Sequence, residues 1–306
     1  MRVLATIGFS FSAGVFLAAL LPWNGWQLYA AGGVLLLALA WLFAARKQKC
    51  FRRGLLLLLP LAVSLAYFAG YDHLVRQPIE DRCGAASDFA ATVCDWPQAT
   101  ERGAKITVEL EGYHRARAVL YGEAELLAAR PGDTVTGTAQ WQSAAHFDSD
   151  DVTHFNARGV YALLYGREDV RLSAGDGDAL RWLPQRAGKA FREKVAAIWD
   201  DPRVSGFLTA ELTGDKSAMD DGDYLAMQET GLAHLFAVSG LHCAFLVTLL
   251  ALLISRRQRL LCAVTIPLLL FYMVMVGMSP SVVRACIMQI FLLIAPLFRR
   301  GRDPLT

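Results

Sequence analysis

Long apolar runs occupy both ends of the chain, and each is about as long as a helix that crosses a membrane, roughly 18 to 20 residues. Six runs have this length, three before and three after a polar middle: Val3–Leu21, Trp26–Ala45, Gly54–Tyr71, Phe236–Ser255, Leu260–Met278 and Ser281–Phe298. A helix satisfies its own backbone hydrogen bonds, which the bilayer core requires because it contains no water. The pattern therefore predicts an α-helical polytopic membrane protein.

The polar middle has the shorter period of β-strands. Between residues 88 and 172, turn residues separate short runs rich in β-branched and aromatic side chains: ATVCDW, AKITVELEGY, ARAVLYG, DTVTGTAQW and a last piece around YALLYGREDVRL. Five short strands in about a hundred residues suggest a small closed barrel of the oligonucleotide-binding (OB) kind. The predicted fold is thus a helical membrane protein with an inserted OB-like barrel, which is not in itself evidence of DNA binding.

A third pattern, from Leu183 to Trp199, has the spacing of an amphipathic helix. Its apolar side consists of Leu183, Ala187, Phe191, Val195 and Ile198, and its remaining positions carry Arg186, Lys189, Arg192 and Lys194. With Trp182 and Trp199 at its ends, it is a candidate for a helix in the outer membrane interface. A helix packed on the barrel is the alternative. Either way, its cations could attract polyanionic DNA.

These patterns divide the chain into residues 1–71, with three membrane helices; 72–180, the β domain; 181–235, amphipathic helices; and 236–306, further membrane helices. Three polar loops carry clusters of basic residues: Arg46, Lys47, Lys49, Arg52 and Arg53; Arg256, Arg257 and Arg259; and Arg299, Arg300 and Arg302. Lys and Arg near helix ends stay on the cytoplasmic side. We therefore expect both termini in the cytoplasm and residues 72 to about 228 outside it.

The composition supports a membrane protein, because 55% of the residues are hydrophobic and ordinary soluble domains have about 45 to 50%. The segment 72–180 contains 18 Asp and Glu against 10 Lys and Arg, whereas a groove that follows a DNA backbone should be basic. Locally, Tyr113, His114, Arg115, Arg117 and Tyr121 interleave bases with aromatics. Arg115 and Arg117 are thus possible outer DNA contacts; the alternative is a solvated strand face on a domain that docks a partner or gates the channel.

The cysteines divide according to compartment. Cys83 and Cys94 are the two of six that fall in the predicted outer segment, where an oxidising environment favours disulfides. We predict that they pair, with two free thiols as the alternative. The other four lie in or beside membrane runs without the spacing of metal ligands, and we interpret them as packing residues: Cys50, Cys243, Cys262 and Cys286. No metal or cofactor is expected.

Three short segments carry the candidate chemistry. Gly231–His242 reads GLAHLFAVSGLH and places Ser239, Gly240 and His242 at the mouth of a membrane helix, where polar groups are candidates for function. Leu212–Ser217 reads LTGDKS, and Ser279–Met288 reads SPSVVRACIM. In this order they resemble the signature of the ComEC family of competence proteins. The N-terminal layout, membrane helices followed by a β-rich segment, is also similar to the domain that precedes the competence region in that family.

The resemblance implies a channel in the bacterial inner membrane that takes up single-stranded transforming DNA. Expected partners are this DNA, membrane lipids, other competence proteins such as a DNA receptor and a cytoplasmic motor, and further copies of the chain. Candidate residues of the DNA path are Lys216, His234, Ser239, Gly240, His242 and Arg284, with possible outer contacts at Arg115, Arg117, Arg186, Lys189 and Arg192. Family members continue beyond the position of Thr306, and many end in a nuclease-like domain. We therefore expect this chain to be an incomplete channel and not an enzyme.

Each candidate has a plainer interpretation. Gly-Asp-Lys-Ser lacks the glycine spacing of a phosphate-binding loop, so Lys216 could be part of a capping and ion-pair element. Ser239 and His242 could be a nucleophile and base, but no GxSxG turn surrounds Ser239 and no nearby acidic residue could orient His242; they could equally form interhelical hydrogen bonds. Arg284 could snorkel to the membrane surface or hold a phosphate.

Two other functions remain compatible with the sequence. One is a small-solute or lipid-linked transporter with the same topology, which DNA-dependent uptake would distinguish from a DNA channel. The other is a membrane serine hydrolase, which labelling of Ser239 by an active-site serine probe would support.

Overall fold

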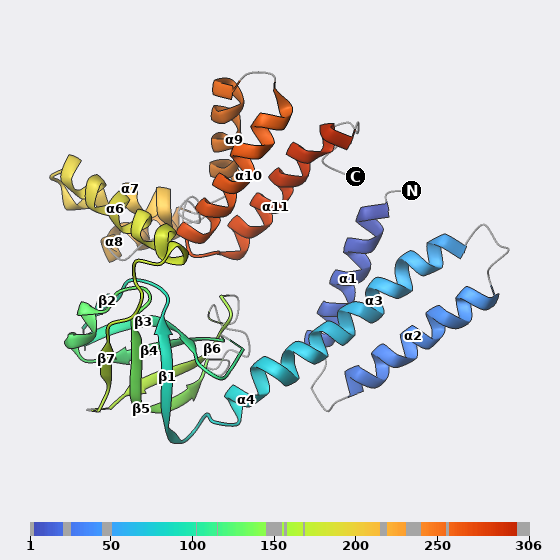
Figure 1. The fold of residues 1–306 in the computed structure, drawn as a ribbon, viewed down its shortest axis with the longest axis horizontal. Helices are drawn as coiled ribbons and strands as arrows, with labels where there is room; N and C mark the ends of the chain where they lie inside the picture. Colours follow the sequence, from blue (N-terminus) through green and yellow to red (C-terminus); the bar gives the residue numbers. More distant parts are fainter. Residues whose placement is uncertain are drawn as a thin grey trace. The chain divides into compact units, whose positions relative to one another are not determined.

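The computed structural model describes residues 3–20, 26–44, 51–101, 103–114, 116–144, 155, 158–167, 169–214, 219–230, 240–254 and 257–298. Contacts divide the chain into two compact units, with the boundary between Asp81 and Arg82. Figure 1 shows helices in the first unit, and a barrel followed by helices in the second.

Small residues allow the helices of the first unit to pack closely. The unit consists of α1 (Val3–Leu20), α2 (Trp26–Ala44) and α3 (Phe51–Tyr71), followed by a π-helical turn (Asp72–Arg76) and α4 (Gln77–Glu80). A Cβ at Gly14 of α1 would clash with the Ser64 hydroxyl of α3, and the Ser10 hydroxyl donates to the Leu57 carbonyl. Close backbone approach and polar contacts of this kind hold helices together where the hydrophobic effect is weak.

The second unit begins with a closed five-stranded barrel, which confirms the barrel prediction. Seven described strands form its sheet: β1 (Ala86–Val93), β2 (Gln98–Thr100), β3 (Gly103–Leu110), β4 (Arg117–Gly122), β5 (Thr134–Ser143), β6 (Val160–Gly166) and β7 (Arg171–Ser173). The short strands β2 and β7 pair with β3 and β5 and are not among the five that close the barrel. The order β1-β3-β4-β6-β5 closes because β5 also pairs with β1. Neighbouring strands are antiparallel except β4 and β6. This Greek-key connection is that of the OB kind.

The strand alternation produces the barrel core. Along β3 every second residue is buried: Ala104, Ile106, Val108 and Leu110. Trp141 of β5 is also buried and donates to the Ser87 carbonyl. Gly103 has φ +136°, and a Cβ there would clash with the Gly122 carbonyl, so the β3–β4 pairing requires glycine at this position.

No disulfide joins Cys83 and Cys94, so the predicted pairing is wrong. The two residues lie beyond opposite ends of β1, which has eight residues and hence a length of about 26 Å. A disulfide joins Cα atoms less than about 7 Å apart. Cys94 is buried, its thiol donates to the Thr92 carbonyl at 3.5 Å, and burial raises the pKa of this thiol to about 12.

Helices make up the rest of the second unit. They are α6 (Leu183–Ile198), α7 (Pro202–Thr213), α8 (Asp221–Glu229), α9 (Gly240–Ile254), α10 (Gln258–Met275) and α11 (Pro280–Ile294), with a 3-10 turn at Ala295–Phe298. Within the described residues, each of the six predicted spans overlaps a helix. Within the described residues, three helical stretches are long and apolar enough to cross a membrane: Gly54–Glu80, Gln258–Met275 and Pro280–Leu297. Shorter apolar helices cover Ala5–Ala19, Tyr29–Ala38 and Leu241–Ile254.

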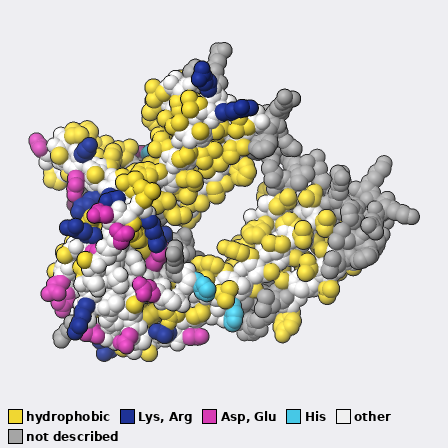
Figure 2. Space-filling view, viewed as in Figure 1, with side chains coloured by type: hydrophobic (Ala, Val, Ile, Leu, Met, Phe, Trp, Pro, Cys, Tyr) yellow, Lys and Arg dark blue, Asp and Glu magenta, His cyan; other side chains and the backbone are white. Residues whose placement is uncertain are grey.

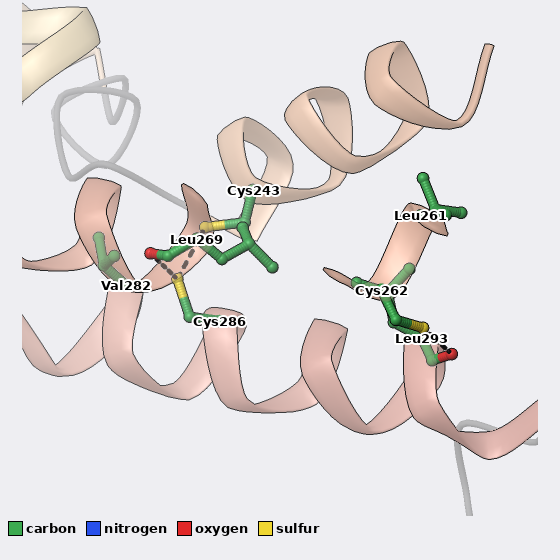
Figure 3. Close-up of a cluster of buried hydrophobic side chains, with 7 residues drawn as sticks. All are labelled: Cys243, Leu261, Cys262, Leu269, Val282, Cys286 and Leu293. Atoms are coloured by element: carbon green, nitrogen blue, oxygen red, sulfur yellow. Dashed lines mark hydrogen bonds between the residues drawn. The ribbon is translucent and has the colours of Figure 1, made fainter. Parts of the chain in front are cut away.

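The helices α9, α10 and α11 share a buried core: Cys243, Leu261, Cys262, Leu269, Val282, Cys286 and Leu293 (Figure 3). Their outward faces are also apolar, with Leu241, Leu252 and Phe291 more than 60% exposed. Figure 2 shows hydrophobic side chains covering these helices, whereas charged side chains gather over the barrel and α6. An apolar outer surface is what a lipid-facing helix bundle requires.

Candidate functional site

The helix α7 brings the start of the LTGDKS segment to a defined position. Its first turn is capped by the Asp201 carboxylate, which accepts from the Arg203 backbone N–H at 2.9 Å. The helix ends at Gly214, whose φ of +73° is typical of a glycine C-cap. Arg203 also binds Asp223 of α8 with two nitrogens, at 2.7 and 3.1 Å. Both ends of α7 are therefore fixed, and Glu211 lies in its last turn.

Two contacts join α7 to the membrane-type helices. The His242 Nε2 of α9 lies 3.5 Å from the Glu211 Oε1, with side chains 18% and 30% exposed. The Tyr272 hydroxyl of α10 donates to the Leu212 carbonyl at 3.3 Å. The start of LTGDKS therefore lies close to His242, the last residue of GLAHLFAVSGLH. The sequence predicted no acidic neighbour for His242, and Glu211 is such a neighbour.

Sequence reasoning missed Glu211 and Tyr272. The 31 positions between Glu211 and His242 place the pair beyond any local pattern. Glu211 directly precedes LTGDKS, and this adjacency was the available signal. A carboxylate at this distance restricts the orientation of the His242 ring.

Arg284 lies on the exposed side of α11. Val282 and Cys286, two positions to either side, are buried in the helix core, so Arg284 projects away from that core, as the 100° turn per residue requires. Whether this side faces a DNA path or the membrane surface stays a prediction. Of the other candidates, Gly240 is the first residue of α9, and Lys216, His234 and Ser239 lie outside the described residues.

The helix α6 is packed rather than isolated. The Trp96 indole N–H donates to the Gln185 carbonyl at 3.1 Å, and the Lys189 ammonium lies 3.9 Å from the centre of the Trp96 ring. The helix also contacts α10, where Gly188 lies against Met275. The helix α6 thus joins the barrel to α10, which agrees with the alternative prediction that this helix packs on the barrel.

One side of α6 remains exposed. Of its predicted apolar side, Val195 is buried, whereas Phe191 and Ile198 are 36% and 68% exposed. A membrane interface for this side stays a prediction. Among the predicted outer DNA contacts, Arg186 binds the Asp178 carboxylate at 3.0 Å and Lys189 lies 3.8 Å from Glu193; Arg192 is half-buried.

The predicted aromatic-basic stretch of the barrel is divided between two places. Tyr113 lies against Trp141 beneath the Arg82 guanidinium, which is 5.3 Å from the Tyr113 ring centre. Tyr121 instead stacks on Tyr165 of the neighbouring strand, with ring centres 5.3 Å apart and planes 12° apart. Arg115 lies outside the described residues. The stretch is therefore not one continuous platform.

A smaller aromatic-basic surface forms around the Tyr121–Tyr165 pair. Lys105 of β3 is opposite Tyr121 in the strand register, whereas Arg117, four residues before Tyr121 along β4, is opposite Glu109. Burial and the charge of Arg158 lower the pKa of the Lys105 ammonium. Stacked rings beside cations are the elements with which single-stranded nucleic acid is bound. Alternation along β3 and β6 predicts the face on which Lys105 and Tyr165 lie. It does not predict that they lie near Tyr121, because that depends on which strands are neighbours.

The C-terminal third of the chain is similar to known proteins. Residues 212–306 match the competence-protein family. The ComE operon protein 3 of Bacillus subtilis (strain 168) is 35% identical over 91 residues. That match covers 29% of this chain and 12% of the Bacillus protein. No solved structure matches the chain.

The matched competence segment starts one residue after Glu211 and contains His242, Tyr272 and Arg284. The contacts of His242 and Tyr272 with α7 therefore join the start of this segment to its apolar helices α9 and α10. Within the part of the chain that the structure describes, no group of three or more His, Cys, Asp and Glu residues could hold a metal ion. Ionisable side chains at the ends of apolar helices are candidates for contact with a polar ligand.

Proposed function

We propose that the chain is part of an inner-membrane channel of the ComEC kind, which carries single-stranded transforming DNA into the cytoplasm during natural competence. One observation carries the proposal: the competence match covers the segment in which α9, α10 and α11 form an apolar bundle with polar motif residues at one end. This end is the one that α7 contacts through the Glu211–His242 pair. The match to a protein of the ComE operon supports the same assignment.

In the proposed topology both termini are cytoplasmic and the barrel lies outside, as a cap that docks a partner or gates the channel. A DNA strand would pass the outer basic residues and follow a path beside Ser239, His242 and Arg284. Phosphates would find a planar bidentate donor in the Arg284 guanidinium. The segment between residues 72 and 180 is acidic by 18 residues to 10, so any contact there would be confined to places such as the Lys105–Tyr121–Tyr165 surface.

The chain would act as a conduit rather than as an enzyme, and other parts of the competence system would supply the driving force. A DNA receptor, a cytoplasmic motor, lipids and further copies of the chain are the expected partners. The residues matched by the Bacillus protein are a small part of that protein's length, so a working channel is expected to need more than the residues described here.

The test is genetic. The gene is deleted in its native host and complemented with this chain or with the longest open reading frame that contains it, and transformation by labelled linear DNA is measured. We expect deletion to abolish uptake and the longer frame to restore it. If deletion leaves uptake unchanged, the DNA-channel proposal fails and a small-solute or lipid-linked transporter becomes the better interpretation.

Point variants then test the motif residues in the complementing gene. His242→Ala and Arg284→Leu should lower the transformation frequency at least tenfold without lowering the amount of protein in the membrane. Thr248→Val is the matched control, since the Thr248 hydroxyl on the same helix donates to the Ala244 carbonyl of its own turn. Full uptake by Arg284→Leu would favour a snorkelling role for this arginine.

A further inference from the structure

Two thiols face one another in the core of α9, α10 and α11. The Sγ atoms of Cys243 and Cys286 lie 3.5 Å apart, and both residues are 0% exposed (Figure 3). They come from α9 and α11, 43 positions apart in the sequence. The Cys286 thiol also lies 3.8 Å from the Leu269 carbonyl. Aliphatic side chains make up most of the rest of this core, Tyr272 and Met273 of α10 pack against it, and each of the two sulfurs has the other as its neighbouring thiol.

The third thiol of the same core has different surroundings. Cys262 of α10 donates to the Leu293 carbonyl at 3.2 Å and lies 3.7 Å from the Gln258 side-chain nitrogen. Figure 3 shows it apart from the other two, beside Leu293. Cys262 is therefore a matched control, because it is buried in the same helix core but its sulfur contacts the Leu293 carbonyl and the Gln258 side chain instead of another sulfur.

We propose that Cys243 and Cys286 form a redox-modifiable pair, which a small disulfide oxidises to a disulfide that joins α9 to α11. One thiol loses its proton and attacks a sulfur of the small disulfide, and the first small thiolate leaves. The second protein thiol then attacks the mixed disulfide, and the second small thiolate leaves. Two S–H bonds and the small S–S bond are lost. One protein S–S bond and two small thiols are formed, and the small disulfide accepts the two electrons.

The geometry favours this pairing. Sulfurs in a disulfide are about 2.05 Å apart, so the two atoms need to approach by about 1.5 Å, a movement on the scale of a side-chain rotation. Cys243 lies three residues after the start of α9 and Cys286 six residues after the start of α11. Both are at the end of the bundle where α6 meets Met275 of α10. In the proposed topology this end faces the oxidising compartment.

The bond would have a consequence for the motif residues. His242 directly precedes Cys243, and Arg284 lies two residues before Cys286, so the bond would fix the distance between the two motif helices. Formation of the bond is independent of DNA uptake, whereas any effect on uptake rests on the proposed function. The test therefore measures the bond itself.

The sequence allows the three thiols to be separated by trypsin. Cleavage after Lys and Arg places Cys243 in 217–256, Cys262 in 260–284 and Cys286 in 285–299. The full chain in its membranes is treated with 2,2′-dithiodipyridine, a permeant small disulfide, and remaining thiols are blocked with N-ethylmaleimide. The protein is digested without reduction, and the peptides are measured by mass spectrometry. Wild type and Cys262→Ser are compared with Cys286→Ser.

We expect the peptides 217–256 and 285–299 to be recovered mainly as one cross-linked species in wild type and Cys262→Ser, two hydrogens lighter than their sum. Cys286→Ser should give no such species. Recovery of Cys243 and Cys286 on separate peptides after oxidation of the wild type would overturn the proposal. Equal cross-linking of Cys262 to either partner would overturn it as well, because the pairing would then not follow from the observed geometry.

Discussion

The contact between α7 and the competence segment makes a quantitative prediction. Glu211→Ala removes the carboxylate that lies 3.5 Å from His242. An ion pair between partly exposed side chains contributes about 0.2 to 1 kcal/mol. These two side chains are 18% and 30% exposed, so we expect the upper half of that range, about 0.5 to 1 kcal/mol. The free energy of opening α7 from α9 should fall by that amount, and the open fraction should rise about 2- to 5-fold.

Hydrogen exchange of the full chain in detergent measures this opening. Amides in the last turns of α7, from Gly206 to Thr213, should exchange about 2- to 5-fold faster in Glu211→Ala, while amides of β3 keep their rates. Glu193→Ala is the control, because Glu193 forms a more exposed pair with Lys189 at 3.8 Å. Unchanged exchange in α7 would refute the reasoning, as would an equal acceleration in β3, which would indicate general destabilisation.

Three further predictions concern other parts of the molecule. Gly14→Val should lower the thermal unfolding midpoint of the chain in detergent, since a Cβ at Gly14 clashes with Ser64; Gly8→Val, with no atom within 4 Å of the added Cβ, should have little effect. Burial raises the pKa of the Cys94 thiol from 9.0 to about 12. The buried neutral thiol therefore stabilises the folded state fully below pH 9, and this stabilisation is lost as the pH rises through 12. In denaturant titrations between pH 8 and 11, Cys94→Ala should therefore lose less stability than wild type. Tyr165→Ala should weaken binding of labelled single-stranded DNA to the chain about 5- to 100-fold if one base stacks on the Tyr121–Tyr165 pair, whereas an unchanged affinity would exclude this surface.

The barrel could be predicted because its signals are local. Alternation along β3 and turn residues between strands determine where strands begin and end, and few closed arrangements accommodate five of them. The same extended strand contradicts the cysteine prediction. That prediction relied on compartment and count, whereas the length of β1 separates Cys83 from Cys94.

The Glu211–His242 pair could not be predicted from either motif alone. Its formation depends on how α7 packs against α9, and no period in the sequence encodes the position of one helix relative to another 31 residues away. The apolar side of α6 shows the same limit. Its spacing predicts a helix, but only packing determines that Val195 faces inward and Ile198 outward. Periodicity identifies an apolar side without specifying whether protein or lipid covers it.

The cations of α6 illustrate how a charge count can mislead about DNA binding. Lys189 lies over the Trp96 ring and beside Glu193, so its charge already stabilises the contact between α6 and the barrel. A cation–π contact of this kind contributes about 0.5 to 1 kcal/mol at an exposed site. Lys189→Gln should therefore lower the unfolding midpoint slightly. The dependence of DNA affinity on salt should keep its slope, because a lysine that binds no phosphate releases no counterion on binding. A decrease in that slope by about one would show that Lys189 binds a phosphate directly.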